Sequence, residues 1–169
     1  NYMTRTYPLR KLGQYDLALE YALKAYAFYE GRRSRLESIT LGILGYIHLE
    51  LEVYDKAMAY FEQELEIVKV LDSNYLLAYN YCEIGRVHMA MGRIGEAIHW
   101  LESGLHLAET YGNKTTLIEN YPCLIQAYKT DQAYEKALAV FEQLADLRAE
   151  VNNNRSINQR NLLLVTHET

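Results

Sequence analysis

Cysteine and long apolar runs are scarce in this sequence, and each scarcity excludes a class of protein. The 169 residues include two cysteines, Cys82 and Cys123, too few for a disulfide framework or a four-cysteine zinc site. Such cysteine usage favours a reducing, cytoplasmic setting. The longest apolar runs cover a few residues, whereas a membrane-spanning helix needs about 20, so we expect no membrane insertion. No basic segment followed by an apolar one opens the chain, so no signal peptide is predicted.

An excess of basic residues is also missing. Lys and Arg number 17 against 22 Asp and Glu, which gives a net charge of −5, so we expect no nucleic-acid partner. Half of the residues are hydrophobic and 23% are charged, which is typical of a folded domain with a core and not of a disordered segment.

What the sequence does contain is an internal repeat of about 40 residues. Four similar segments each contain an alanine, and these alanines recur at intervals of 39, 40 and 40 residues, at Ala18, Ala57, Ala97 and Ala137. A second matched set lies 12 residues upstream of the last three, at Gly45, Gly85 and Ile125. Two sets in the same register predict a repeat architecture.

The spacing of apolar residues within each unit is helical, and strand signals are almost absent. Two capping boxes are predicted, one with Ser34 and Glu37 and one with Thr116 and Glu119. We predict helices over 4–12, 15–30, 35–51, 54–71, 75–91, 94–111, 116–130 and 134–151, followed by a helical tail.

These units resemble the tetratricopeptide repeat. The second unit carries the family's pattern at Leu41, Leu44-Gly45, Tyr54, Ala57 and Phe61, and the third and fourth units repeat it. The resemblance implies an all-α, right-handed superhelical solenoid of helix-turn-helix repeats, of a variety with longer helices than the usual 34-residue unit. We expect a repeat domain over 1–151, with units 1–33, 34–73, 74–113 and 114–151, and a tail over 152–169 that links to a downstream domain.

The resemblance also assigns the small residues a packing role and marks three departures. Gly45 and Gly85 have no side chain, so the second helix of each unit can approach the first. The fourth unit departs through Pro122 and Ile125, and we expect it to be distorted or to function as a cap. Glu64 replaces the alanine that the family prefers, and we expect its carboxylate to reach solvent.

No catalytic or metal-binding constellation is present in the sequence. His48 and His88 are repeat-equivalent and are interpreted as packing residues, and both cysteines as buried structural ones. His99 and His106 lie two helical turns apart, about 10 Å, too far for one zinc ion. We therefore expect no enzyme activity in this region, no metal and no cofactor.

The resemblance implies that the first helices of successive units line a concave groove. Tyr and Arg are common interface anchors, and we expect Tyr79 and Arg86 to support binding while contributing little to folding. Gly42 and Tyr46 stand where some family members carry the Lys and Asn that clamp a C-terminal carboxylate, which disfavours a chaperone-tail receptor. The expected groove residues are Ile39, Tyr46, Tyr79, Glu83, Arg86, Glu119, Gln126 and Lys129.

The function implied is a protein- or ligand-interaction module with a protein or peptide partner. The resemblance favours the regulatory or sensory repeat domain of a larger bacterial signalling protein, with a diguanylate cyclase or histidine kinase downstream. The alternatives are a free-standing scaffold or adaptor and a short-peptide receptor.

The tail carries four consecutive apolar residues, Leu162 to Val165. Exposed apolar runs usually mark an interaction surface, so we expect the tail to be helical and covered. Two arrangements satisfy this expectation: folding back onto the last helix pair, or a homodimer contact with the same segment of a second chain, which we favour.

Overall fold

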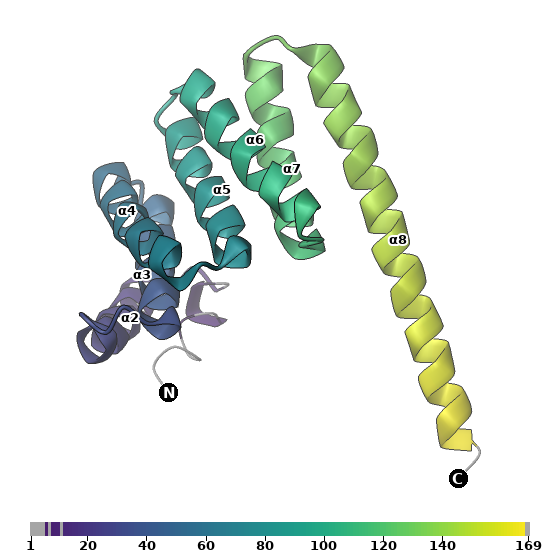
Figure 1. Ribbon diagram of the computed structural model, residues 1–169, viewed down its shortest axis with the longest axis horizontal. Coiled ribbons are helices and arrows are strands. Elements are labelled where there is room, and N and C mark those ends of the chain that lie inside the picture. Colours follow the sequence, from purple (N-terminus) through teal and green to yellow (C-terminus); the bar gives the residue numbers. More distant parts are fainter. Residues whose placement is uncertain (1–5, 7, 11, 168–169) are drawn as a thin grey trace.

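Helices alternate with short turns in the described part of the computed structural model (Figure 1). The structure describes residues 6, 8–10 and 12–167, with side chains as far as residue 154, and no strand occurs among them, which confirms the all-α prediction. A helical turn at 8–10 precedes the main helices. These are α2 (Tyr15–Tyr29), α3 (Arg35–Glu50), α4 (Tyr54–Leu71), α5 (Asn74–Ala90), α6 (Ile94–Thr110), α7 (Lys114–Thr130) and α8 (Tyr134–His167).

The predicted helix bounds agree with the structure to within two residues from Tyr15 to Thr130. The first predicted helix, at 4–12, lies partly outside the described residues. The last helix is longer than 134–151, because α8 continues without a break through Asn152–Asn154 to His167. The boundary predicted between 151 and 152 therefore coincides with no interruption of the backbone, and the division into repeat domain and linker stays a prediction.

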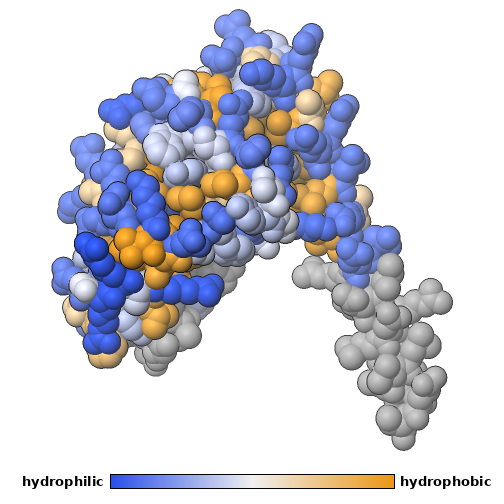
Figure 2. Space-filling view, in the orientation of Figure 1, coloured by the Kyte–Doolittle hydropathy of each residue, from blue (hydrophilic) through white to orange (hydrophobic). Residues whose placement is uncertain are grey.

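The helices form antiparallel pairs that stack into an arc (Figure 1). Within the pairs, α3 packs on α4, α5 on α6 and α7 on α8, and each pair also contacts the next one. On the face shown in Figure 2, hydrophilic residues predominate and apolar ones form small patches among them. Most of the large apolar side chains therefore pack between the helices.

Side-chain caps begin three of the helices. The first predicted capping box is confirmed in its serine half, because the Ser34 hydroxyl accepts a hydrogen bond from the Glu37 backbone N–H at 3.3 Å. The Glu37 carboxylate accepts from the Gly31 and Arg33 N–H groups instead of closing the box. The second predicted capping box is wrong: α7 begins at Lys114, and Asn113 caps it by accepting from the Thr116 backbone N–H at 3.2 Å. Asparagine is a better N-cap than threonine, so Asn113 starts the helix before Thr116.

In all four units, the turn between the two helices of the pair has one residue in the left-handed conformation, and it stands at the same position of the repeat. These residues are Gly13, Glu52, Gly92 and Gln132, with φ between 59° and 73°. They recur at the 39-, 40- and 40-residue intervals of the alanines. Glycine adopts this conformation freely, whereas Glu52 and Gln132 hold it at a cost, so turn geometry is fixed by the repeat and not by the residue type.

The two helices of each middle unit touch where the sequence predicts small residues. Ala57 and Ala97 are fully buried, and a Cβ atom at Gly45 would lie 2.8 Å from the Phe61 ring. At Gly85 a Cβ atom would lie 2.7 Å from the Leu101 Cγ and 3.0 Å from its backbone nitrogen. Such distances are below van der Waals contact, so a larger residue at Gly45 must displace the Phe61 ring, and one at Gly85 must displace Leu101 and its backbone.

The fourth unit has the same helices but a looser second helix. Pro122 is exposed within α7, and the helix continues past it. Ile125 occupies the glycine position, and Phe141, equivalent to the buried Phe61 and Leu101, is 57% exposed. Among the described helices α8 packs only on α7, so one of its apolar faces remains open.

Replacing either packed glycine by leucine should destabilise the fold. We expect Gly45→Leu and Gly85→Leu each to lower the free energy of unfolding by roughly 1–3 kcal/mol or more through overpacking. Gly95→Leu is the matched control, because nothing lies within 4 Å of the added Cβ and leucine is a better helix former. Urea unfolding that gives both packed variants the stability of the parent would contradict this packing.

The continuous α8 leaves dimer contact as the expected role of the tail. A helix of 34 residues is roughly 50 Å long, and Figure 1 shows α8 extending past α7 without folding back. Sedimentation of the full chain should therefore reveal a dimer that a version ending at Glu150 does not form. Equal monomeric sedimentation of the two chains, with equal melting temperatures, would show that the tail makes no such contact.

Candidate functional site

The first helices of successive units form one continuous surface. Helix α3 contacts α5 and α5 contacts α7, whereas α4 and α6 make no contact with each other in the described part of the chain. The inner surface, as we call the face formed by α3, α5 and α7, is thus the place where side chains from three units meet. It corresponds to the groove expected from the sequence.

A tyrosine between two arginines lies on the inner surface. The Arg10 Cζ is 3.6 Å from the centre of the Tyr46 ring, and the Arg86 Cζ is 5.4 Å from it. A guanidinium over an aromatic face is attracted by roughly 0.5–1 kcal/mol at exposed sites, so these contacts orient the side chains more than they stabilise the fold. Tyr46 and Arg86 were expected here from the sequence, whereas Arg10 was not, because it precedes the region of clear repeat pattern.

The buried carboxylate of Glu83 forms a salt bridge with Arg86. The Arg86 Nη1 donates to the Glu83 Oε1 at 3.0 Å, and the two side chains are 28% and 1% exposed. Burial raises the pKa of Glu83, and the guanidinium of Arg86 opposes that rise. Glu83 was expected to point into the groove, but its carboxylate lies beneath the surface and presents Arg86 to the groove.

Tyr79 completes this cluster on α5. The negative charge of Glu83 raises the pKa of the Tyr79 hydroxyl, and burial adds to the effect. The hydroxyl therefore stays protonated and can donate a hydrogen bond at neutral pH. The inner-surface cluster, as used below, consists of Arg10, Tyr46, Tyr79, Glu83 and Arg86.

The remaining predicted residues lie around this cluster. Glu119 is exposed on α7, and its charge contributes to the raised pKa of both Tyr79 and Glu83. Gln126 and Lys129 are exposed further along α7, and in the described structure neither side chain has a hydrogen bond or ion pair to the cluster. The structure thus brings Tyr46, Tyr79, Glu83 and Arg86 together and leaves Gln126 and Lys129 apart.

A cavity of about 300 Å³ adjoins the cluster between the N-terminal turn, α3 and α5. It shares Arg10 and Tyr79 with the cluster, so the two form one site. Ile39 lines it, as the groove prediction required, and Glu64 forms its floor although Glu64 belongs to α4. The cavity is also lined by Thr6, Arg35, Gly42, Ile43, Tyr75 and Leu76.

The expectation that the Glu64 carboxylate reaches solvent is wrong. The residue is 2% exposed, and its oxygens accept hydrogen bonds from the Ser38 hydroxyl at 3.4 Å and the Asn80 amide at 3.1 Å. Gly42 on α3 makes room for it, because a Cβ there would lie 2.9 Å from both carboxylate oxygens. The unusual Gly42 and Glu64 are therefore complementary, which their separate appearance in the sequence did not reveal.

Burial determines the charge of Glu64. It raises the pKa of the carboxyl group to about 8, while the hydrogen bond from Asn80 opposes the rise. At neutral pH the group is mostly protonated. The floor of the cavity is consequently polar but uncharged.

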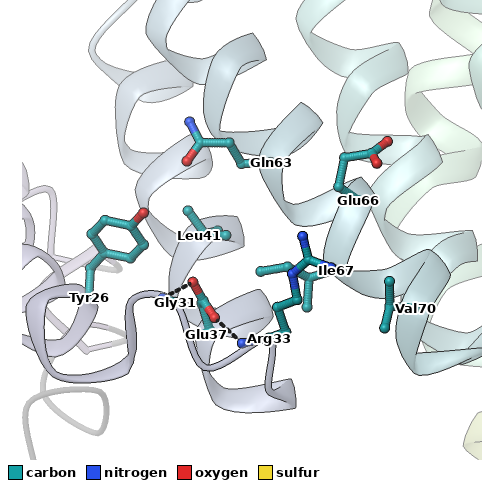
Figure 3. Close-up of a pocket in the computed structure, with 9 residues that line it drawn as sticks. All are labelled: Tyr26, Gly31, Arg33, Glu37, Leu41, Gln63, Glu66, Ile67 and Val70. Carbon is teal, nitrogen blue, oxygen red and sulfur yellow. Dashed lines mark hydrogen bonds between the residues drawn. The ribbon is translucent and has the colours of Figure 1, made fainter.

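A second hollow of about 280 Å³ lies between α2, α3 and α4 (Figure 3). Glu37 points into it, but both of its oxygens are already used, accepting from the Gly31 N–H at 2.8 Å and the Arg33 N–H at 2.6 Å. These bonds fix the turn before α3. A carboxylate committed to the backbone has little left for a ligand, so the inner surface is the stronger candidate.

His48, Cys82 and Cys123 are held in packed surroundings. His48 is buried and stacks on Tyr60 with ring centres 5.4 Å apart, as expected of a packing residue. Burial raises the pKa of both thiols, which makes them poor nucleophiles. Among the side chains that the structure describes, which end at residue 154, no group of three or more metal-ligating residues is found. No helix in the described part of the chain is long and apolar enough to cross a bilayer.

Comparison with known proteins agrees with this architecture. Residues 40–72 and 78–111 each match a family model described as a tetratricopeptide repeat. Tetratricopeptide repeat protein 29 of Homo sapiens is 27% identical over 139 residues, and that of Macaca fascicularis is 26% identical. The matches cover 82% of this chain but 29% of each relative, so the chain spans less than a third of their length.

Solved structures with the same fold are less similar in sequence. Aspartyl phosphate phosphatase F from Bacillus subtilis has a TM-score of 0.80 at 15% identity, over 89% of this chain and 40% of that one. A Rap protein complexed with Competence and Sporulation Factor has a TM-score of 0.79 at 18% identity, over 91% and 43% of the two chains. A putative kinesin light chain from Podosopora anserina has a TM-score of 0.69 at 17% identity, over 88% and 74%. At these identities the similarity is one of fold.

Glu64 should make stability depend on pH. Its pKa is about 8 in the folded chain against an ordinary value of 4.5, so between these pH values the unfolded chain ionises while the folded chain stays protonated. The contribution of Glu64 is fully present below about pH 4.5 and is lost as the pH rises to about 8, by roughly 3–5 kcal/mol.

Glu64→Gln should remove this dependence. Urea unfolding at about pH 5, 6.5 and 8 should show the wild type losing stability more steeply than the variant. Glu62→Gln, at an exposed position of the same helix, is the control and should follow the wild type. A constant difference between Glu64→Gln and wild type at all three pH values would contradict a protonated Glu64.

Proposed function

We propose that this chain, an array of tetratricopeptide repeats, binds a peptide or an extended protein segment on the inner surface. The observation that carries the proposal is the inner-surface cluster, in which Arg86 is partly exposed to the groove and tied to a buried Glu83. A buried charge pair is costly to desolvate and adds little to stability compared with apolar packing. Its presence on the shared face of three units is better explained by recognition than by folding.

The residue types of the cluster suit such a partner. Tyrosine and arginine dominate the energetics of protein interfaces, since they combine apolar area with directed hydrogen bonds. The Tyr79 hydroxyl and the Arg86 guanidinium are donors, so the cluster fits the carbonyl and carboxylate oxygens of a peptide. The Rap structure with Competence and Sporulation Factor supports the proposal, because that protein of similar fold is in complex with a second molecule.

The finer assignment is a regulatory domain of a larger signalling protein. It rests on the resemblance alone, since none of the relatives and structures described above points to a diguanylate cyclase. Peptide binding by the inner surface is common to the sensor, scaffold and receptor interpretations, so it is the step to test first.

Removing both charges of the Glu83–Arg86 pair should weaken binding without unfolding the chain. Arg86→Ala alone would strand a buried carboxylate, so the test uses Glu83→Gln/Arg86→Gln, whose amides can pair with each other. A random peptide library is selected on the wild type, and the best peptides are titrated by calorimetry. We expect affinity for the double variant to fall roughly 10-fold or more, which is about 1.4 kcal/mol.

Arg148→Gln is the matched control, because Arg148 is exposed on α8 away from the inner surface. It should keep wild-type affinity, and all three proteins should melt at similar temperatures. Selected peptides that bind the double variant as tightly as the wild type would show that the cluster is not the binding site.

A further inference from the structure

The cavity floored by Glu64 has features that peptide binding in general does not require. We propose that it is a specificity pocket for an apolar side chain that stands next to a carboxylate, a refinement that rests on the proposed function. The carboxylate can come from the C-terminus of the ligand or from a neighbouring Asp or Glu side chain. Both sources present the same chemistry to the pocket.

The size and walls of the cavity select an apolar side chain. About 300 Å³ is room for one large side chain and not for a folded element. Ile39, Ile43 and Leu76 supply aliphatic walls, and the Tyr75 ring is 52% exposed. Covering such a surface removes apolar area from water, which favours binding.

The mouth of the cavity selects a negative charge. Arg10 and Arg35 both line it, and neither makes a salt bridge within the described structure. The Nε of Arg10 is buried without a hydrogen-bond partner. Glu83, the nearest acidic residue on α5, is already paired with Arg86, so two guanidinium groups remain for a carboxylate, which they bind in a matching planar geometry.

A protonated Glu64 carries no charge, so it does not repel an anion bound in the same cavity. Arg10, Arg35 and Tyr79 line the cavity together with Glu64, and the charge of Glu83 on α5 adds to the raised pKa of Glu64. With Glu64 protonated, the charge of the pocket is set by its two arginines. A ligand amine would meet these arginines, and a purely apolar ligand would leave them unused.

Small ligands can test separately whether the cavity requires an apolar side chain and whether it requires a carboxylate. We would titrate the 15N-labelled full chain with N-acetyl-leucine, N-acetyl-leucine amide, N-acetyl-aspartyl-leucine amide and N-acetyl-glycine. Amide shifts at Gly42, Tyr75 and Tyr79 report occupancy. N-acetyl-leucine carries a terminal carboxylate, and N-acetyl-aspartyl-leucine amide carries a side-chain carboxylate. We expect one of these two probes to bind at least roughly 10-fold more tightly than N-acetyl-leucine amide and N-acetyl-glycine. The tighter of the two shows whether the carboxylate of the natural ligand is terminal or belongs to a side chain.

Variants assign the contacts. Arg35→Gln should weaken the anionic probes several-fold and leave N-acetyl-leucine amide unchanged, while Tyr75→Ala should weaken every leucine probe. Both residues are on the surface, so the folds should persist, and Arg148→Gln is again the control. Raising the pH from about 7 to about 9 ionises Glu64, so anionic probes should weaken in the wild type but not in Glu64→Gln.

The titration with small ligands can fail independently of the peptide titration of the Glu83→Gln/Arg86→Gln variant. Equal binding of leucine probes with and without a carboxylate, or no shift at Gly42 and Tyr75 up to roughly 10 mM, overturns the pocket even if selected peptides bind the inner-surface cluster. Conversely, probes that shift these residues while Glu83→Gln/Arg86→Gln binds peptides normally would support the pocket and reject the cluster.

Discussion

Close contact between the two helices of a unit is the constraint on which the rest of the structure depends. Gly45 admits the ring of Phe61, and Gly85 admits Leu101, so each pair packs at a distance that a side chain would prevent. Gly104 makes a third such contact, because its Cβ would lie 2.7 Å from the Cys82 sulfur. Regular pairs stack regularly, and the first helices therefore align along one face.

Because the first helices align, polar residues that are far apart in the sequence lie next to one another. Arg10, Tyr46 and Arg86 come from three segments of the chain, and they meet only because the units stack. Two buried carboxylates support the site in different ways. Glu83 keeps a charge partner at 3.0 Å, whereas Glu64 is surrounded by hydrogen-bond donors and burial favours its neutral form. Each avoids the large cost of an uncompensated buried charge.

The fourth unit shows what happens when the glycine is absent. Ile125, a partly buried residue, stands at the position of Gly45 and Gly85, and Phe141 lies largely outside the core. The unit keeps its two helices because Ala137 and Leu144 are still buried against α7. Helix formation thus tolerates the change, while the contact characteristic of the middle units does not survive it.

The sequence by itself determined the repeat and the helix bounds from Tyr15 to Thr130. Periodicity and small residues are local or regularly spaced signals, and each unit repeats them. It did not determine the fate of Glu64, because its burial depends on the space left by Gly42 and on Asn80 from the next unit. Nor did it place Arg10 over Tyr46 or put Glu83 beneath Arg86. Such contacts join residues from different helices, or depend on how a side chain turns toward its neighbours, and only the tertiary structure decides them.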